Sequence, residues 1–103
     1  MVELTSLSDI VDLQVLQDMQ DSFSDITKLA MIIVDYQGSP ITNYSNFTPH
    51  CKYLRSREKC QELCFESDAV SGAKATRKSA PYIFTCYSGL VDISIPIIFE
   101  RKM

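Results

Sequence analysis

The chain has 103 residues, of which 46% are hydrophobic and 22% are charged, which is the composition of one ordinary globular domain. Its formal net charge of -3 does not indicate binding to nucleic acid or to an anionic membrane surface. Its apolar runs are far shorter than the roughly 20 residues of a membrane-spanning helix, and its start lacks the basic and apolar regions of a secretory signal. We therefore expect a single cytoplasmic domain over residues 1–103, whose cysteines are thiols or metal ligands rather than disulfides.

The first predicted element is a helix over about residues 9–24, within an N-terminal region of residues 1–26. Asp9 and Asp12 suit the positive end of its dipole. Apolar residues recur at the spacing of one helix face, at Ile10, Leu13, Leu16, Met19 and Phe23. We expect this face to pack on the rest of the domain.

A hairpin is predicted next. Residues 29–34 have the pattern of a buried strand, residues 36–39 form a turn with Gly38 at its tight position, and residues 40–44 lead out as a second strand. From residue 48 to residue 80 the pattern becomes helical. Pro49 suits a first helical turn, and two helices fit best, with a possible break near Ser71 and Gly72.

The last predicted element is a second hairpin. Residues 82–86 and 91–99 are β-branched and aromatic runs, and Ser88 and Gly89 separate them where a turn needs positive φ. Alternation along the strand places Tyr82 and Phe84 on one packed face. Cys86 and Tyr87 then lie at the lip of the hairpin.

The order helix, two strands, helices, two strands predicts an α+β fold. We expect a PAS-like antiparallel sheet with helices packed on one face. Residues 29–34 and 82–99 would share that sheet, and the helices of residues 51–75 would cover it.

Three cysteine-containing segments carry a family resemblance. They read Asn-Phe-Thr-Pro-His-Cys at residues 46–51, Cys-Phe-Glu-Ser-Asp at residues 64–68, and Cys-Tyr-Ser-Gly-Leu-Val-Asp at residues 86–92, followed by Ile-Pro-Ile. In this order they resemble the PocR-type sensory domain, over residues 7–99. The resemblance implies that the fold is truncated before its last strand and that the polypeptide is a fragment of a larger signalling protein. Two departures are Tyr87, where the family usually carries histidine, and the extra Cys60.

The resemblance implies a signal-input domain and not an enzyme. Such a domain binds a small organic ligand, such as a short diol or another hydrocarbon derivative, without a cofactor. It controls an output domain in the same polypeptide, such as a transcription regulator, a histidine kinase or a chemoreceptor. Aromatic rings and thiols in the three segments are the ligand-binding candidates: Tyr44, Phe47, Cys51, Cys64, Cys86 and Tyr87.

Other interpretations of the same residues stay open. The thiols could hold a metal or an iron-sulfur centre or sense redox state, with Cys51, Cys60, Cys64 and Cys86 as the candidate set. They could also be small apolar core residues, because free cysteine is often buried. A homodimer is a further possibility, through the N-terminal helix or through an open sheet edge. The chain has no Ser-His-Asp order and no glycine-rich phosphate loop, so catalysis is not predicted.

Overall fold

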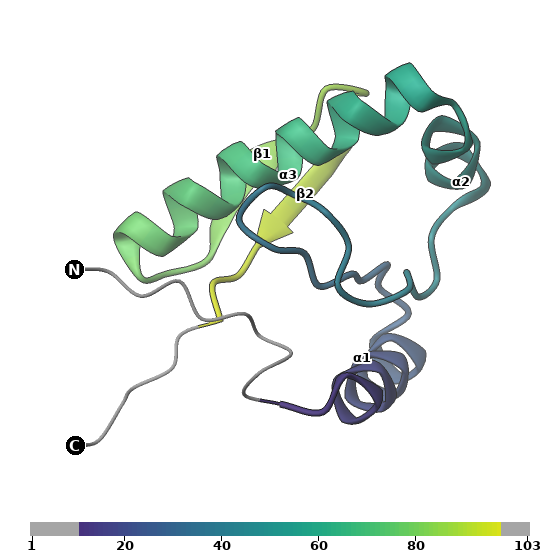
Figure 1. The fold of residues 1–103 in the computed structure, drawn as a ribbon, viewed down its shortest axis with the longest axis vertical. Helices are drawn as coiled ribbons and strands as arrows, with labels where there is room; N and C mark the ends of the chain where they lie inside the picture. Colours follow the sequence, from purple (N-terminus) through teal and green to yellow (C-terminus); the bar gives the residue numbers. More distant parts are fainter. Residues whose placement is uncertain (1–10, 98–103) are drawn as a thin grey trace.

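The computed structural model describes residues 11–97, which form three helices and two strands (Figure 1). The elements are α1 (Leu13–Thr27), α2 (Pro49–Ser56), α3 (Glu58–Lys78), β1 (Tyr82–Thr85) and β2 (Val91–Ser94). The two strands pair antiparallel, and α3 lies across one face of the pair. The predicted α+β class is confirmed.

α1 is the predicted N-terminal helix, and the predicted start at residue 9 lies outside the described residues. The helix begins after Asp12, whose side chain accepts a hydrogen bond from the backbone N–H of Gln14. It ends at Lys28, which takes the left-handed conformation with φ 62°. The helix is therefore confirmed but shifted, since residues 11 and 12 precede it and it continues three residues past the predicted end at residue 24.

The packed face of α1 differs from the prediction. Met19 and Phe23 are 64% and 52% exposed, whereas Gln20 and Ser24 are buried. The reason is that residues 29–46 present backbone carbonyls, such as those of Leu29 and Asn43, that accept no backbone N–H of the described residues, and such groups need donors when they are covered. The helix turns its amide and hydroxyl side chains toward them, and its apolar stripe faces outward.

The first predicted hairpin does not form strands. Only two isolated antiparallel bridges join its arms, Met31 with Ser45 and Val34 with Pro40. Between them, the Ile33 N–H donates to the Thr42 hydroxyl, 3.0 Å away, so a side chain replaces the ladder bond. The prediction that residues 29–34 share a sheet with the last hairpin is wrong for the described residues, in which the sheet has only β1 and β2.

The turn of this segment is where it was predicted. Gly38 has φ +80°, and a Cβ there would lie 1.9 Å from the backbone carbonyl oxygen of Phe65 in α3. Glycine is therefore required both by the backbone conformation and by the close approach of the turn to the helix.

Two helices follow, as predicted. The Thr48 hydroxyl caps α2 by accepting a hydrogen bond from the Cys51 N–H, and Pro49 occupies the first turn. The chain breaks at Arg57, which is extended with φ -102° and ψ 120°. The predicted break near Ser71 and Gly72 is wrong, because α3 continues through both residues.

The second hairpin is confirmed. Ser94 pairs with Tyr82, Asp92 pairs with Phe84, and these four side chains are the half-buried ones that face α3. Gly89 takes φ +92° in the turn, as the sequence predicted. β2 ends at Ser94, so the predicted last strand is too long over residues 95–97, and its part after residue 97 lies outside the described residues.

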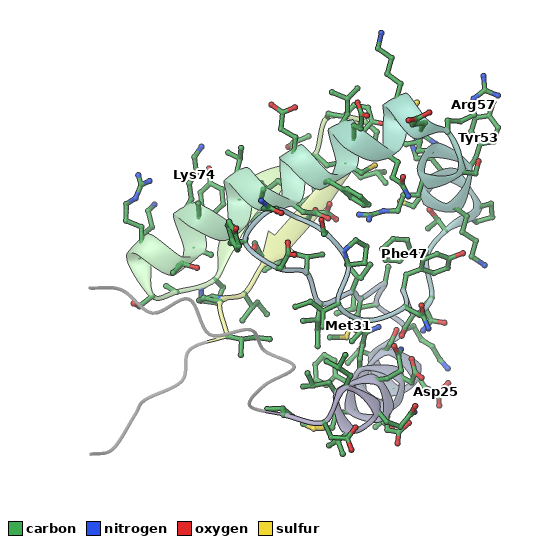
Figure 2. The ribbon with its side chains drawn as sticks, viewed as in Figure 1. Asp25, Met31, Phe47, Tyr53, Arg57 and Lys74 are labelled. Atoms are coloured by element: carbon green, nitrogen blue, oxygen red, sulfur yellow. The ribbon has the colours of Figure 1, made fainter. Side chains whose placement is uncertain are left out.

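The apolar core is thin. Among residues 11–97, Ala75 of α3 is the one apolar residue that is fully buried. Figure 2 shows the side chains, with Phe47 pointing into the space that the three helices surround. Polar contacts and aromatic rings therefore hold much of the domain together.

Candidate functional site

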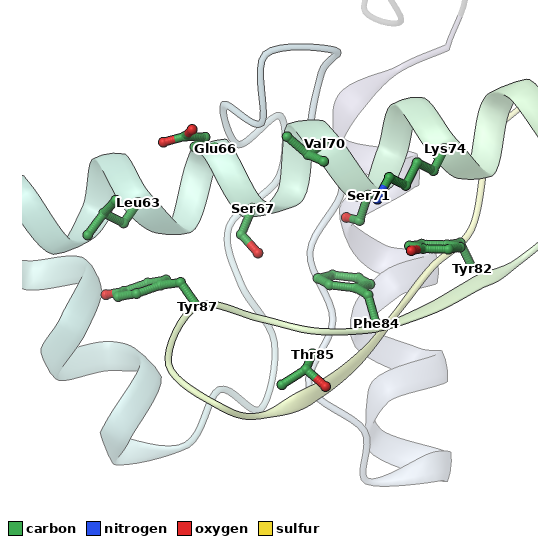
Figure 3. Close-up of a pocket in the computed structure, with 10 residues that line it drawn as sticks. All are labelled: Leu63, Glu66, Ser67, Val70, Ser71, Lys74, Tyr82, Phe84, Thr85 and Tyr87. Atoms are coloured by element: carbon green, nitrogen blue, oxygen red, sulfur yellow. The ribbon is translucent and has the colours of Figure 1, made fainter.

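A groove of about 500 Å³ lies between α3 and β1. Figure 3 shows the rings of Tyr82, Phe84 and Tyr87 rising from the hairpin toward the helix. The opposite wall comes from α3 and includes Leu63 and Ser67. The groove thus has the position of a pocket between a sheet and its covering helix.

Regular spacing explains which side chains meet there. Leu63, Ser67 and Ser71 are four residues apart, so they lie on one face of α3. Tyr82 and Phe84 are two residues apart on β1 and share its inner face, with ring centroids 6.1 Å apart and an interplanar angle of 8°. The predicted shared face of these two rings is confirmed.

The groove combines apolar rings with hydroxyl groups. Ser67 and Tyr87 offer hydroxyls, while one acid, Glu66, and one base, Lys74, line it with opposite charges. A pocket with convergent neutral polar groups and no excess charge suits a small neutral polar organic molecule.

The Tyr87 hydroxyl ties the hairpin turn to α3. It donates a hydrogen bond to the backbone carbonyl of Cys60, 3.3 Å away, and interacts with the Cys64 thiol. Burial raises the pKa of the Cys64 thiol above its usual value, and the Tyr87 hydrogen bond only partly offsets this. Cys64 is therefore a protonated thiol at neutral pH and is not activated as a nucleophile.

The other predicted cysteines occupy different places. Cys51 lies near enough to Cys64 to influence its pKa, so these two thiols and Tyr87 are brought together. Cys86 lies in the hairpin turn, where its sulfur is 3.0 Å from the Ser88 hydroxyl. None of the three cysteines lines the groove.

Tyr44 and Phe47 form a separate aromatic pair. Their ring centroids are 4.8 Å apart, with an interplanar angle of 15°. Tyr44 lines a second, smaller cavity, and Phe47 lines neither hollow. Of the six predicted ligand-binding residues, Tyr87 is thus the one that the structure places in the groove.

A part-buried ion pair joins α2 to α3. Arg55 Nη2 lies 2.9 Å from Asp68 Oδ2, and the two side chains are 13% and 19% exposed. Burial raises the pKa of Asp68, which Arg55 partly offsets, and burial together with Asp68 raises the pKa of Asp92. Two carboxyl groups and one guanidinium therefore influence one another here.

Residues 9–103 match the family model described as the sensory domain found in PocR. This chain belongs to the PocR sensory domain family. The regulatory protein PocR of Salmonella typhimurium is 32% identical over 90 residues, which make up 87% of this chain and 30% of that protein. The chain thus spans about 30% of the length of this curated relative. No solved structure matches the chain.

The three segments that resemble the PocR family converge in this structure. Residues 46–51 enter α2, residues 64–68 lie in the middle of α3, and residues 86–92 form the hairpin turn and the start of β2. Cys51 and Tyr87 interact with Cys64, and Asp92 interacts with Asp68. Segments that are far apart in the sequence therefore meet around one part of α3.

A cysteine-based metal site is the alternative interpretation of the same thiols. Within residues 11–97, no three histidine, cysteine or acidic side chains are grouped so that they could hold a metal ion. The candidate set Cys51, Cys60, Cys64 and Cys86 consists of four free thiols.

Within residues 11–97, no helix combines the length and the apolar character that crossing a membrane requires.

Sequence reasoning missed most of the groove wall. Leu63, Ser67 and Ser71 share a helix face, which four-residue spacing could have indicated once the strand opposite was known. The sequence did not indicate that Arg55 is part-buried, because one arginine in a short polar helix is usually exposed. Its role depends on Asp68, which lies 13 residues away in the sequence.

Proposed function

We propose that this domain is a non-enzymatic signal-input module that binds a small neutral organic ligand in the groove between α3 and β1. The observation that carries the proposal is the set of aromatic rings and hydroxyls around about 500 Å³, in a chain of a sensory domain family. A short diol or a similar hydrocarbon derivative suits this lining, because its carbons can lie on Tyr82 and Phe84 while its hydroxyls reach Ser67 or Tyr87.

Ligand binding would act by favouring one arrangement of the groove. The groove lies between two separate elements, and the Tyr87 hydroxyl already holds the hairpin turn to α3. A ligand that binds more tightly to one spacing of helix and hairpin shifts the population toward that spacing. We propose that an output domain in the same polypeptide, such as a transcription regulator, a histidine kinase or a chemoreceptor, responds to this shift in the cytoplasm.

We further propose that the domain forms a homodimer through α1. Val15, Met19 and Phe23 follow one another at four-residue spacing and are 48%, 64% and 52% exposed. A second copy of the same stripe would cover these apolar side chains. In the part of the chain that the structure describes, no third strand joins the β1–β2 pair, and its edges offer another route to the same oligomer.

Calorimetric titration with a panel of short diols tests the ligand proposal. Ser67→Leu should abolish binding by filling the groove, whereas Ser22→Leu, on the exposed surface of α1, should leave the affinity unchanged. Equal affinity in both variants would place the ligand elsewhere. Lack of binding by any diol would remove this ligand class.

Native mass spectrometry of protein purified without oxygen separates the ligand proposal from the cysteine alternative. The ligand proposal predicts a spectrum with either an added organic mass or the mass of the chain alone. It also predicts that Cys86→Ser has the same melting temperature as wild type. A metal or iron-sulfur mass that Cys86→Ser removes, together with a loss of stability, would favour the alternative, because metal binding and folding are coupled at cysteine sites.

A further inference from the structure

A second cavity, of about 300 Å³, lies between residues 32–44, α2 and α3. It shares no lining residue with the groove. Its walls come from three separate segments of the chain, so whatever occupies it would contact all three.

The charge of this cavity is one-sided. Lys52 and Arg55 are in its wall, and no aspartate or glutamate is. Apolar surface is present as well, from Ile32, Tyr44 and Phe65. The lining therefore suits a molecule that is negatively charged at one end and apolar at the other.

Arg55 is held in place and is incompletely hydrogen bonded. Its guanidinium lies 5.1 Å from the ring centroid of Phe47 and 5.8 Å from that of Phe65, and Nη2 donates to Asp68. The Nη1 group is buried and has no hydrogen-bond partner within residues 11–97. The Arg55 side chain also lines the cavity, and a carboxylate is the acceptor that a guanidinium prefers.

Lys52 supplies the second positive charge. Its Nζ lies 5.9 Å from the ring centroid of Tyr44, and its side chain forms no ion pair with the described residues. Lys52 and Arg55 are three residues apart, so they lie on the same side of α2. Two donors on one helix face can bind the two oxygens of one carboxylate.

We propose that this second cavity binds a small monocarboxylate with an aromatic or apolar body. The carboxylate lies between Lys52 and Arg55, and the body lies against Tyr44 and Phe65. This site goes beyond the proposed function, because it is separate from the groove and takes an anion where the groove takes a neutral molecule.

Benzoate and its neutral isostere benzamide provide the test, titrated calorimetrically into the full chain at one fixed ionic strength. Benzoate should bind at least about tenfold more tightly than benzamide, because a charge-assisted hydrogen bond is worth about 1.4 kcal/mol or more. Equal affinity of the two probes, or no binding of benzoate, would overturn the proposal.

Two lysine variants locate the benzoate site. Lys52→Gln should weaken benzoate binding by about tenfold while the circular dichroism spectrum stays unchanged, since this side chain is exposed. Lys74→Gln removes the cation of the groove instead and should leave benzoate affinity unchanged. Weaker binding in Lys74→Gln with wild-type affinity in Lys52→Gln would refute the site. Diol binding is measured separately with Ser67→Leu, so failure of one proposal leaves the other standing.

Discussion

Two regions of this small domain are held together by different means. In the first, which we call the α1 junction, the helix contacts residues 31–46 through buried amide and hydroxyl groups. In the second, the α3 junction, the helix faces the β1–β2 hairpin with aromatic rings that leave a groove. The polar junction satisfies its own groups and leaves apolar side chains outside, whereas the aromatic junction leaves an open groove.

The difference indicates a division of tasks. The Gln20 amide donates to the Asn43 carbonyl at 2.7 Å and to the Ser45 hydroxyl at 2.8 Å, which fixes α1 in one orientation. The apolar stripe of α1 is then presented to a partner. At the α3 junction, rings and hydroxyls face one another across a space, as a ligand site requires.

The turn at Gly38 connects the two regions, and its substitution should have the largest effect. Gly38→Ala should destabilise the fold by on the order of 3 kcal/mol, because the new Cβ would lie 1.9 Å from the Phe65 carbonyl oxygen. Chemical unfolding followed by circular dichroism measures this.

Gly89→Ala is the matched control. Gly89 also has positive φ, but nothing lies within 4 Å of its added Cβ. The Gly89→Ala variant should lose only about 1 kcal/mol of its free energy of unfolding, which is the cost of the backbone conformation. Equal losses in the two variants would show that contact with α3 does not matter.

The α1 junction should weaken when its central amide is removed. Gln20→Ala leaves the Asn43 carbonyl and the Thr42 hydroxyl without their buried partner, so we expect a loss of about 2 kcal/mol. Gln14→Ala, an exposed glutamine of the same helix, should stay within about 0.5 kcal/mol of wild type. Urea unfolding of the three proteins checks this, and a stable Gln20→Ala variant would contradict a polar junction.

The outward stripe of α1 can be tested without affecting either junction. Met19→Glu should convert a dimer into a monomer in multi-angle light scattering, because it places a charge in the middle of the apolar stripe. Gln14→Glu, at an exposed position on another side of the helix, should remain dimeric. A wild-type chain that is monomeric at high concentration would refute the dimer, and a Met19→Glu dimer would assign the interface to another surface, such as the strand edges.

Asp92 should make the α3 junction sensitive to pH. Burial and Asp68 raise its pKa in the folded chain above the ordinary 3.8, so the charged form opposes folding at neutral pH. This penalty disappears as the pH falls through the raised pKa. Asp92→Asn should therefore melt at a higher temperature than wild type at pH 7.

The same pair of proteins provides the control for this prediction. The melting temperatures should converge as the pH approaches 3.8, where the wild-type carboxyl group is neutral in the folded chain. A constant difference at every pH would mean that the amide acts through packing and not through charge.

Much of the fold was predictable from local signals. Pro49 in a first helical turn, Gly38 and Gly89 as turn residues, and the alternation of β1 each act within a few residues, so the sequence indicated them. The inward face of α1 was mispredicted because it depends on the Leu29 and Asn43 carbonyls, which accept hydrogen bonds from polar side chains of the helix. Periodicity shows that a helix has two faces, but not which one its neighbours require.

The candidate site was less predictable, for the same reason. The family segments indicated Tyr87, which does line the groove, and three cysteines, which do not. Ser67 and Leu63 face the groove only because β1 lies opposite α3, and no local pattern shows that pairing. The second cavity depends on Arg55, whose position is set by Phe47, Phe65 and Asp68 from other segments.

Fluorine NMR of protein labelled with 3-fluorotyrosine tests the ligand groove most directly. The chain has five tyrosines, of which Tyr82 and Tyr87 line the groove and Tyr44 lines the second cavity. Titration with a short diol should shift the Tyr82 and Tyr87 signals and leave those of Tyr36, Tyr44 and Tyr53 in place. A saturable shift at Tyr44 alone, or the absence of any shift at Tyr82 and Tyr87, would contradict a ligand site between α3 and β1.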